Sequence, residues 1–238
     1  MEKYYNNLFS VKNNAFTLAE VLITLGIVGV VAAITIPNLI ANSKAHKLRS
    51  QFLKSYSTVQ QAFKLMEQDD ISTDPSTYPA KTFYKTFFQY FVGGLDCGAG
   101  KKVPLPCYYG GSSVSIDERP PYKSLDGKSD VSYIWFDDGQ LALPDGSLIS
   151  LENPSANGSW VSVDLNGYNN PPNKWGYDLF TFQFIDGELI TMGDARSNYP
   201  DTNKYCNRKG SGAMNGVSCA QLAKQNPDYF KTLVREIK

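Results

Sequence analysis

Residues able to do acid–base or nucleophilic chemistry are scarce in this sequence. The chain of 238 residues contains one histidine, His46, which stands near Lys44, Lys47 and Arg49 and is expected to be a solvated polar residue. A Ser-His-Asp or Cys-His arrangement needs a histidine beside a nucleophile, and a zinc site needs further His or CxxC ligands. Loop glycines between residues 98 and 111 lack the Lys-containing helix start of a phosphate-binding loop. The sequence therefore predicts no enzyme and no catalytic residue.

Oxygen-bearing side chains recur along the segment 164–178. Asp164, Asn166 and Asn170 precede a second carboxylate, Asp178, and Gly167 stands among them. This spacing is similar to half of a calcium-binding loop, although no Glu occupies the twelfth position. The same residue types also favour Asx-turns, in which the side chains accept hydrogen bonds from nearby backbone N–H groups. Both interpretations stay open, so calcium is the one cofactor that the sequence suggests, with these four Asp and Asn residues as its candidate ligands.

A single carboxylate interrupts a long apolar run near the amino terminus. From Phe16 to Ile36 the chain has twenty-one residues and one charge, Glu20. As a helix rising about 1.5 Å per residue, the run is roughly 31 Å long, which matches the hydrocarbon core of a bilayer. A carboxylate there costs about 2.5 kcal/mol or more near the bilayer centre, which indicates a cationic partner. The alternative is that Glu20 reaches the membrane interface, because it lies near one end of the run.

The residues around Glu20 form a motif. Phe16, Thr17, Leu18 and Glu20 fit the pattern F-T-L-x-E, which follows a polar leader and opens the apolar helix. In these residues the chain resembles type IV prepilins and the pseudopilins of type II secretion. The resemblance covers about the first fifth of the chain. It implies cleavage between Ala15 and Phe16 and N-methylation of the new amino terminus at Phe16, although the family usually has Gly where this chain has Ala15.

The resemblance also implies roles for two residues of the helix. Glu20, the fifth residue of the processed chain, would pair with the free α-amino group of Phe16 in its own chain or in a neighbouring subunit during assembly. Pro37 lacks an N–H and clashes with the preceding turn, which predicts a kink or a locally melted turn. Several pseudopilins bind calcium in a C-terminal loop, which adds to the calcium hypothesis for residues 164–178.

The function implied by the resemblance is structural. The chain is expected to be a pilin-like or pseudopilin subunit of a type IV pilus or of a type II secretion pseudopilus. Such a subunit crosses the bacterial inner membrane once, carries its C-terminal domain in the periplasm, and is processed by a prepilin peptidase. It then joins other pilin or pseudopilin subunits in a helical filament.

Other identities fit the sequence less well. An ordinary signal peptide would be cut at small residues directly after its apolar region, and no small-x-small site immediately follows Ile36. A plain anchor would not need Glu20. A competence-type pilin that binds DNA would show basic clusters, and only Lys101-Lys102 and Arg208-Lys209 suggest one. Net charge is zero and becomes −1 when residues 1–15 are removed, so no basic excess favours nucleic acid. A membrane-tethered enzyme would need the catalytic residues that the chain lacks.

Four cysteines, all beyond the apolar run, indicate an oxidising compartment. Four cysteines allow three pairings. We expect the local pairs Cys97–Cys107 and Cys206–Cys219, because each closes a Gly-rich segment with few apolar residues to order it. The second pair also resembles the C-terminal disulfide-bounded region of type IV pilins.

Apolar periodicity predicts an α+β fold built on one long helix. A stripe at spacings of three and four continues beyond Pro37 and needs a sheet to cover it. The stripe consists of Leu48, Phe52, Tyr56, Val59, Phe63 and Met66. The expected segments are a leader at 1–15, a transmembrane or filament-core helix at 16–40, its amphipathic continuation at 41–70, and a globular domain at 71–238.

Short strands separated by turns predict an antiparallel sheet on this helix. The expected strands are 131–136, 141–143, 148–151, 160–165, 179–185 and 188–192. Pro144-Asp145-Gly146 and Asp186-Gly187 are the hairpin signals. A short helix is expected within 80–91, an irregular insertion at 93–119, and a loop-rich C-terminal part with two short helical segments.

Overall fold

The computed structural model describes residues 16–100, 105–108, 120–153 and 158–236. The predicted leader, with Ala15, and the Lys101-Lys102 pair lie outside these residues. The described chain divides into two units between Asn42 and Ser43. The compact globular unit begins at Ser43, so the second half of the long helix belongs to it.

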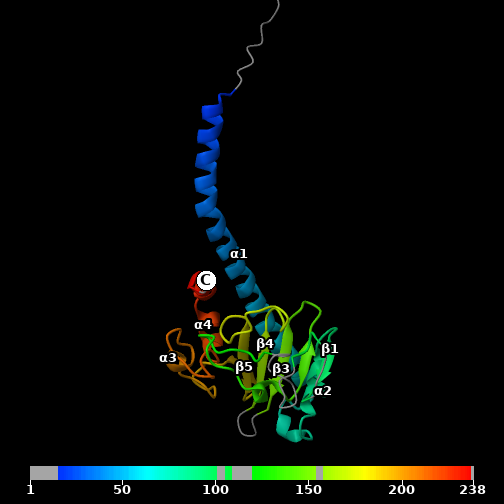
Figure 1. The fold of residues 1–238 in the computed structure, drawn as a ribbon. Helices are drawn as coiled ribbons and strands as arrows, with labels where there is room; N and C mark the ends of the chain where they lie inside the picture. Colours follow the sequence, from blue (N-terminus) through cyan, green and yellow to red (C-terminus); the bar gives the residue numbers. More distant parts are fainter. Residues whose placement is uncertain (1–15, 101–104, 109–119, 154–157, 237–238) are drawn as a thin grey trace, which may run out of the picture. The chain divides into compact units, whose positions relative to one another are not determined.

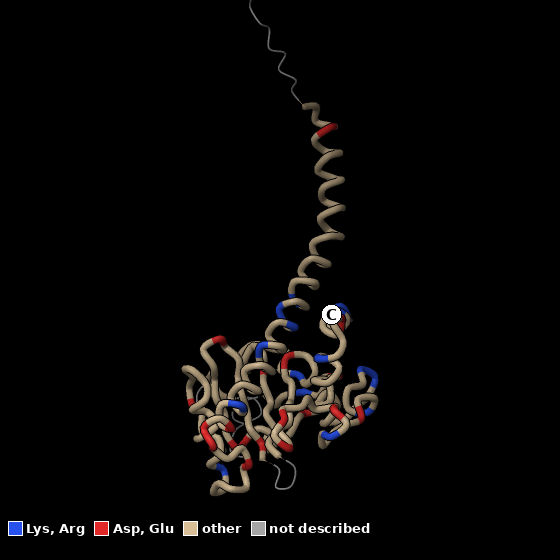
Figure 2. The backbone as a smooth tube through the Cα atoms, turned by 180° about the vertical axis from the view of Figure 1, so that it is seen from behind, with Lys and Arg blue, Asp and Glu red and all other residues tan. Residues whose placement is uncertain are grey.

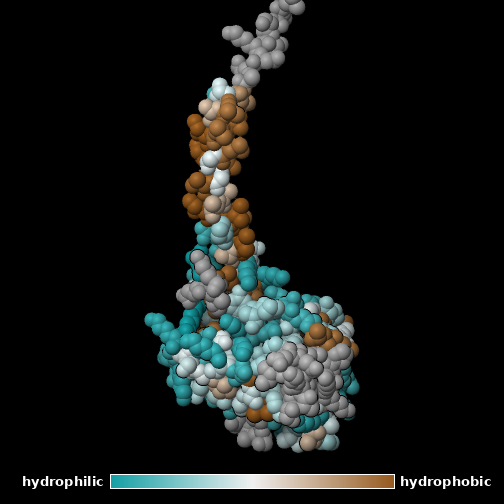
Figure 3. Space-filling view, in the orientation of Figure 1, coloured by the Kyte–Doolittle hydropathy of each residue, from teal (hydrophilic) through white to brown (hydrophobic). Residues whose placement is uncertain are grey.

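Helix α1 extends over Leu18–Gln68. Apolar Leu, Ile, Val and Ala residues fill its first part, and nearly all side chains from Leu18 to Ile40 are exposed (Figure 3). The helix remains α-helical across Pro37, so the locally melted turn expected there is not formed. The kink stays a prediction. The helix ends before Asp70, whose positive φ of 55° breaks the helical path.

Six strands follow one another in an antiparallel sheet whose spatial order equals the chain order (Figure 1). The strands are β1 Leu95–Gly98, β2 Gln140–Ala142, β3 Leu148–Glu152, β4 Ser159–Asp164, β5 Leu179–Ile185 and β6 Glu188–Thr191. Tight turns connect the predicted hairpins. Between β5 and β6, Asp186 and Gly187 have φ values of 52° and 76°, which suit a two-residue hairpin turn. The α+β class predicted from the sequence is thus the observed one.

The main core of the globular unit lies between α1 and one face of the sheet. Five of the six predicted stripe residues are buried, and Tyr56 is half-buried. The ring of Phe63 stacks on Phe184 with centroids 3.9 Å apart, and Phe52 meets Phe180 edge-on at 4.9 Å. Aromatic packing of this kind adds to the burial of apolar area, so the stripe fixes α1 on the sheet.

A second core covers the opposite face of the sheet. Trp160 of β4 and Leu179 of β5 are buried there together with loop residues such as Tyr122 and Trp175. The indole N–H of Trp175 donates to the Thr181 hydroxyl at 3.0 Å, which satisfies a polar group inside this layer. Among the described residues, loops and the 3₁₀ helix Tyr133–Phe136 therefore cover this face.

Short helices complete the globular unit. They are α2 Phe83–Phe87, α3 Thr202–Tyr205, α4 Cys219–Gln225 and α5 Tyr229–Glu236, with 3₁₀ turns at Pro75–Thr77, Phe88–Tyr90 and Tyr133–Phe136. The backbone N–H of Gln221 in α4 donates to Met192 O at 3.2 Å, directly after β6. Helix α4 therefore lies against this end of the sheet.

Two predicted segments differ from the structure. Residues 131–136 were expected to form a strand, but Tyr133–Phe136 is a 3₁₀ helix. Val131 and Phe136 are buried while Ile134 is exposed, so the segment follows a turn rather than the alternation of a strand. The insertion 93–119 was expected to be irregular, but it contains β1, which pairs with β2.

Candidate functional site

The start of α1 is held by a reciprocal pair of side chains. The backbone N–H and the hydroxyl of Thr17 each donate to Glu20 Oε2 at 2.8 Å. The backbone N–H of Glu20 donates in return to Thr17 Oγ1 at 3.2 Å. This is a capping box, in which two orphan N–H groups of a helix start are satisfied at once. Glu20 was expected to act in pairing, and this local role was not predicted, although the T-x-x-E spacing signals it.

Beyond Glu20 the helix carries no charged side chain until Lys44 (Figure 2). Among the described residues, α1 is the one helix whose length and composition suit a membrane span. In the uncleaved chain the Phe16 nitrogen belongs to a peptide bond, so the amine proposed to pair with Glu20 arises only on cleavage. Both hydrogen bonds that the Glu20 side chain accepts from Thr17 use Oε2, so Oε1 can accept a bond from such a partner.

The four candidate calcium ligands lie in one loop, where they accept and donate hydrogen bonds within the chain. Asp164 Oδ1 accepts from the N–H groups of Asn166 and Gly167 at 3.2 and 2.9 Å, and its Oδ2 accepts from the Tyr122 hydroxyl at 2.9 Å. The amide of Asn166 donates to Asn170 O, and that of Asn170 donates to Asn166 O. The bonds from the Asn166 and Gly167 N–H groups to Asp164 Oδ1 are the Asx-type bonds that the alternative interpretation expects.

The second carboxylate of this loop is held in the same way. Asp178 Oδ1 accepts from the Lys174 N–H at 2.7 Å, and Oδ2 accepts from the Asn173 N–H at 3.0 Å. Both Asp164 and Asp178 are fully buried. Burial raises the pKa of both carboxyls, and for Asp164 the nearby Asp178 adds to the increase. The buried oxygen Asn166 Oδ1 has no partner among the described residues.

A cluster of three carboxylates that the sequence analysis missed lies elsewhere on the sheet. Oxygens of Asp137, Asp138 and Glu152 come within 4.8 Å of one another. The ammonium of Lys81 lies 2.9 Å from Asp137 Oδ2 and 3.3 Å from Asp138 Oδ1. Burial, together with the neighbouring Asp138 and Asp137, raises the pKa of Glu152 to about 8. The cluster thus holds one internal cation and one carboxyl that keeps its proton at neutral pH.

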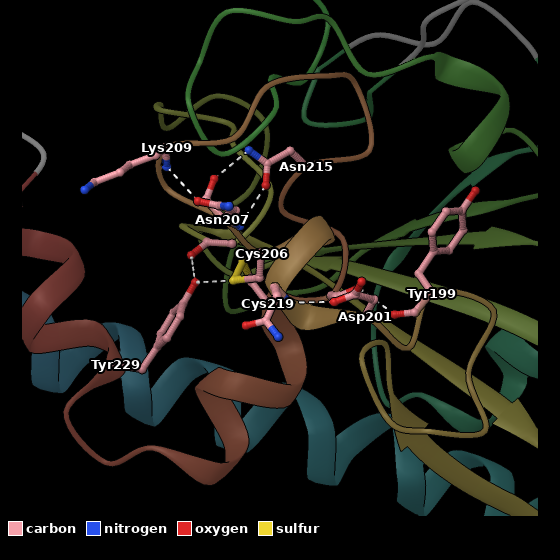
Figure 4. The surroundings of a disulfide bond; sticks show 11 residues. Tyr199, Asp201, Cys206, Asn207, Lys209, Asn215, Cys219 and Tyr229 are labelled. Atoms are coloured by element: carbon pink, nitrogen blue, oxygen red, sulfur yellow. Dashed lines mark hydrogen bonds between the residues drawn. A yellow bond between two sulfur atoms is a disulfide. The ribbon is translucent and has the colours of Figure 1, made fainter.

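Both disulfides expected from the sequence are present. Cys97 bonds to Cys107 and Cys206 to Cys219, with Cα–Cα distances of 5.8 and 4.9 Å. Because Cys219 is the first residue of α4, the second disulfide attaches the loop after α3 to a helix that lies against the sheet (Figure 4).

Side chains around this disulfide order the loop further. Asp201 caps α3 by accepting from the N–H groups of Asn203 and Lys204. Asn207 N donates to Asn215 Oδ1 at 2.9 Å, and Asn215 Nδ2 donates to Asn207 O at 2.8 Å (Figure 4). The loop that contains Arg208 and Lys209 is therefore a defined surface of the globular unit.

The comparison with known families gives one match. The family model for the prokaryotic N-terminal methylation motif matches residues 11–36. The matched segment contains Ala15, Phe16 and Glu20 and is the signature of pilins and pseudopilins. The chain thus carries the pilin-type amino-terminal motif on an apolar helix, which fits a single-pass membrane anchor. Searches among curated proteins and among solved structures gave no match.

Proposed function

We propose that this protein is a pilin-like subunit that is anchored in the bacterial inner membrane by residues 16–40 and assembled into a filament of a type IV pilus or a type II secretion pseudopilus. The observation that carries the proposal is the methylation motif at residues 11–36 on a helix whose apolar side chains are exposed. A soluble domain would bury such a helix. Lipid before assembly and the helices of neighbouring subunits after it are the two environments that suit this surface.

Processing creates the group that assembly needs. In the proposed sequence, a prepilin peptidase hydrolyses the bond between Ala15 and Phe16 and releases the leader. The new α-amino group of Phe16 then lies at the capping box, close in the chain to Glu20. A carboxylate in an apolar filament core is strongly destabilising unless it is paired, so pairing with a Phe16 amine favours one register between subunits.

Cleavage is tested at the amino terminus. We expect mass spectrometry of the protein, purified from cells with an active prepilin peptidase, to find Phe16 as the first residue, carrying one N-methyl group. Ala15→Glu should block processing by placing a bulky charge at the scissile bond. Ala15→Gly is the matched control, and it should be processed at least as well as the wild type. A chain that keeps Met1 in such cells would contradict the proposal.

A further inference from the structure

We propose that a basic collar at the start of the globular unit binds the head groups of anionic phospholipids in the membrane that the apolar segment crosses. The collar is defined by five side chains, Lys44, Lys47 and Arg49 of α1 and Lys231 and Arg235 of α5. The inference rests on the membrane anchoring in the proposed function. It adds a lipid-binding surface to a unit otherwise assigned to contacts between subunits.

The charges of α1 are distributed unequally. Between Glu20 and Glu67 the helix contains five Lys or Arg residues and no acidic residue. The two that come last along α1 have acidic partners, since Lys54 pairs with Asp145 at 2.6 Å and Lys64 with Glu67 at 2.7 Å. The three that directly follow the apolar segment are those of the collar.

The collar residues of α1 lack such close acidic partners. Lys47 is exposed and makes no ion pair among the described residues. Lys44 is exposed and lies over the Tyr177 ring, 5.3 Å from its centroid. Arg49 donates to the backbone oxygen of Asn226 at 3.4 Å. Lys44 and Arg49 act electrostatically on Asp178 and Asp228, respectively, without an ion pair among the described residues. The exposed ammonium groups of Lys44 and Lys47 therefore face solvent, where an external anion can reach them.

Helix α5 adds its charges to the same end of the unit (Figures 1 and 2). Phe230 of α5 is buried against Phe52 of α1, with ring centroids 5.9 Å apart. Lys231 and Arg235 are four residues apart and so lie on one side of α5. Asp228 forms an ion pair with Lys231 at 2.9 Å and also interacts electrostatically with Arg49 and Arg235. Glu236 follows in the last turn, and its side chain lies outside the description.

Position along the chain favours a membrane over other anionic partners. Lys44 follows Ile40 by four residues in the sequence, and Arg49 follows it by nine. Basic side chains that directly follow a membrane-spanning segment in the chain are within reach of the phosphate layer when that segment occupies the hydrocarbon core. Because the apolar segment already holds the protein in the membrane, binding of the collar to the same membrane has a much smaller entropic cost. Each cation near an anionic surface then strengthens binding by about fivefold.

The test measures lipid preference on the full chain. The protein is purified in a neutral detergent, and bound lipid is counted by native mass spectrometry during titration with phosphatidylglycerol or phosphatidylcholine. We expect the wild type to prefer phosphatidylglycerol by at least tenfold. A triple variant of the collar should lose most of this preference; it combines Lys44→Gln, Lys47→Gln and Arg235→Gln. A control triple variant should keep the preference for phosphatidylglycerol. It deletes the same charge from exposed positions elsewhere and combines Lys128→Gln, Lys204→Gln and Lys209→Gln.

Three results would overturn the collar. They are an equal affinity of the wild type for both lipids, an equal loss in collar and control variants, and binding of a DNA duplex as tight as that of phosphatidylglycerol. Resistance to carbonate extraction from vesicles is measured on the same preparations. A chain that integrates without lipid preference contradicts the collar alone, whereas a chain that fails to integrate contradicts the anchoring on which the proposed function depends.

Discussion

At the scale of single residues, Glu20 has an observed role in the capping box and a proposed role in assembly, and the two roles differ in what they require. The capping box needs only an acceptor oxygen near the Thr17 N–H, which an amide also offers. Pairing with the amine of a processed Phe16 needs a negative charge. The two roles are therefore separable by substitution.

We expect Glu20→Gln and Glu20→Ala to leave the protein in the membrane and to reduce its incorporation into filaments severely. Both variants remove the charge, and removing a carboxylate makes the helix easier to hold in lipid. Thr17→Val is the matched control, because it weakens the cap by about 1 kcal/mol and keeps the charge. Sheared filaments quantified against the membrane pool give the measurement. Normal filament content in the Glu20→Gln strain would disprove the pairing role.

Glu152 predicts how stability depends on pH. Its pKa rises from the ordinary 4.5 to about 8 in the folded protein because of burial and the nearby Asp138 and Asp137. Between these values the folded state holds a proton that the unfolded state has lost, so this carboxyl lowers the stability as pH rises from about 4.5 to 8.

The variant Glu152→Gln should remove this pH dependence. We expect it to match the wild type near pH 5 and to be more stable at pH 8.5, by about 1 kcal/mol, because solvent screens a partly exposed carboxylate. Thermal unfolding at the two pH values gives the comparison. Parallel stability curves for variant and wild type would show that Glu152 titrates normally.

At the scale of elements, the sequence predicted those helices and strands whose signal is local, either a turn motif or a helical periodicity. The β5–β6 hairpin was predictable because Asp186-Gly187 favours positive φ values independently of the rest of the fold. The stripe on α1 was predictable because helical periodicity alone selects its buried side. Strand β1 was not, since Leu95–Gly98 is four residues long and contains no β-branched residue. The carboxylate cluster was missed because Lys81, Asp137 and Glu152 are distant in the chain and meet only in the folded sheet.

The loop 164–178 illustrates the same limit, because oxygen spacing alone does not separate an Asx-turn from a calcium site. The carboxylate oxygens of this loop accept hydrogen bonds from N–H and O–H groups of the same chain. The buried oxygen Asn166 Oδ1, by contrast, has no hydrogen-bond partner among the described residues. We therefore keep calcium binding as a prediction with a direct test.

A calcium ion held by Asp164, Asn166, Asn170 and Asp178 should raise the melting temperature. At one hundred times its dissociation constant, bound calcium adds about 2.7 kcal/mol to the free energy of unfolding. Melting with millimolar calcium and with chelator measures it, and Asn170→Ala is a variant that should lower the shift without removing a buried carboxylate. An unchanged melting temperature in the wild type would assign the four side chains to Asx-turns alone.

At the scale of the whole molecule, the globular unit is a sheet covered on both faces by different means. Helix α1 covers one face through a continuous apolar stripe, which the sequence predicts. Loops cover the other face through residues such as Tyr122 and Trp175, whose positions depend on contacts far apart in the chain. These loops do not belong to the six-stranded sheet and so lack its regular backbone hydrogen bonds. We therefore expect the disulfides to stabilise this side and the C-terminal part most.

The order of the C-terminal part is expected to depend on its disulfide, whereas the order of the sheet and of α1 is not. We expect the double variant Cys206→Ala, Cys219→Ala to lose about 3 kcal/mol, the value of a loop of this size in the chain-entropy model. Residues 201–217 should lose order first, because the disulfide and a few Asn and Asp hydrogen bonds hold α3 and the following loop. The sheet and α1 should persist, since the cluster around Phe52 and Phe182 does not depend on the bond.

Hydrogen exchange followed by mass spectrometry measures this outcome segment by segment. In the variant, protection should fall in residues 201–217 and remain in β3, β4 and β5. The matched variant Cys97→Ala, Cys107→Ala should leave residues 201–217 protected, because it opens a different loop. Loss of protection throughout the sheet in the Cys206 and Cys219 variant would show that the disulfide supports the whole unit. In that case the C-terminal surface could not vary independently of the sheet and helix α1 that support it.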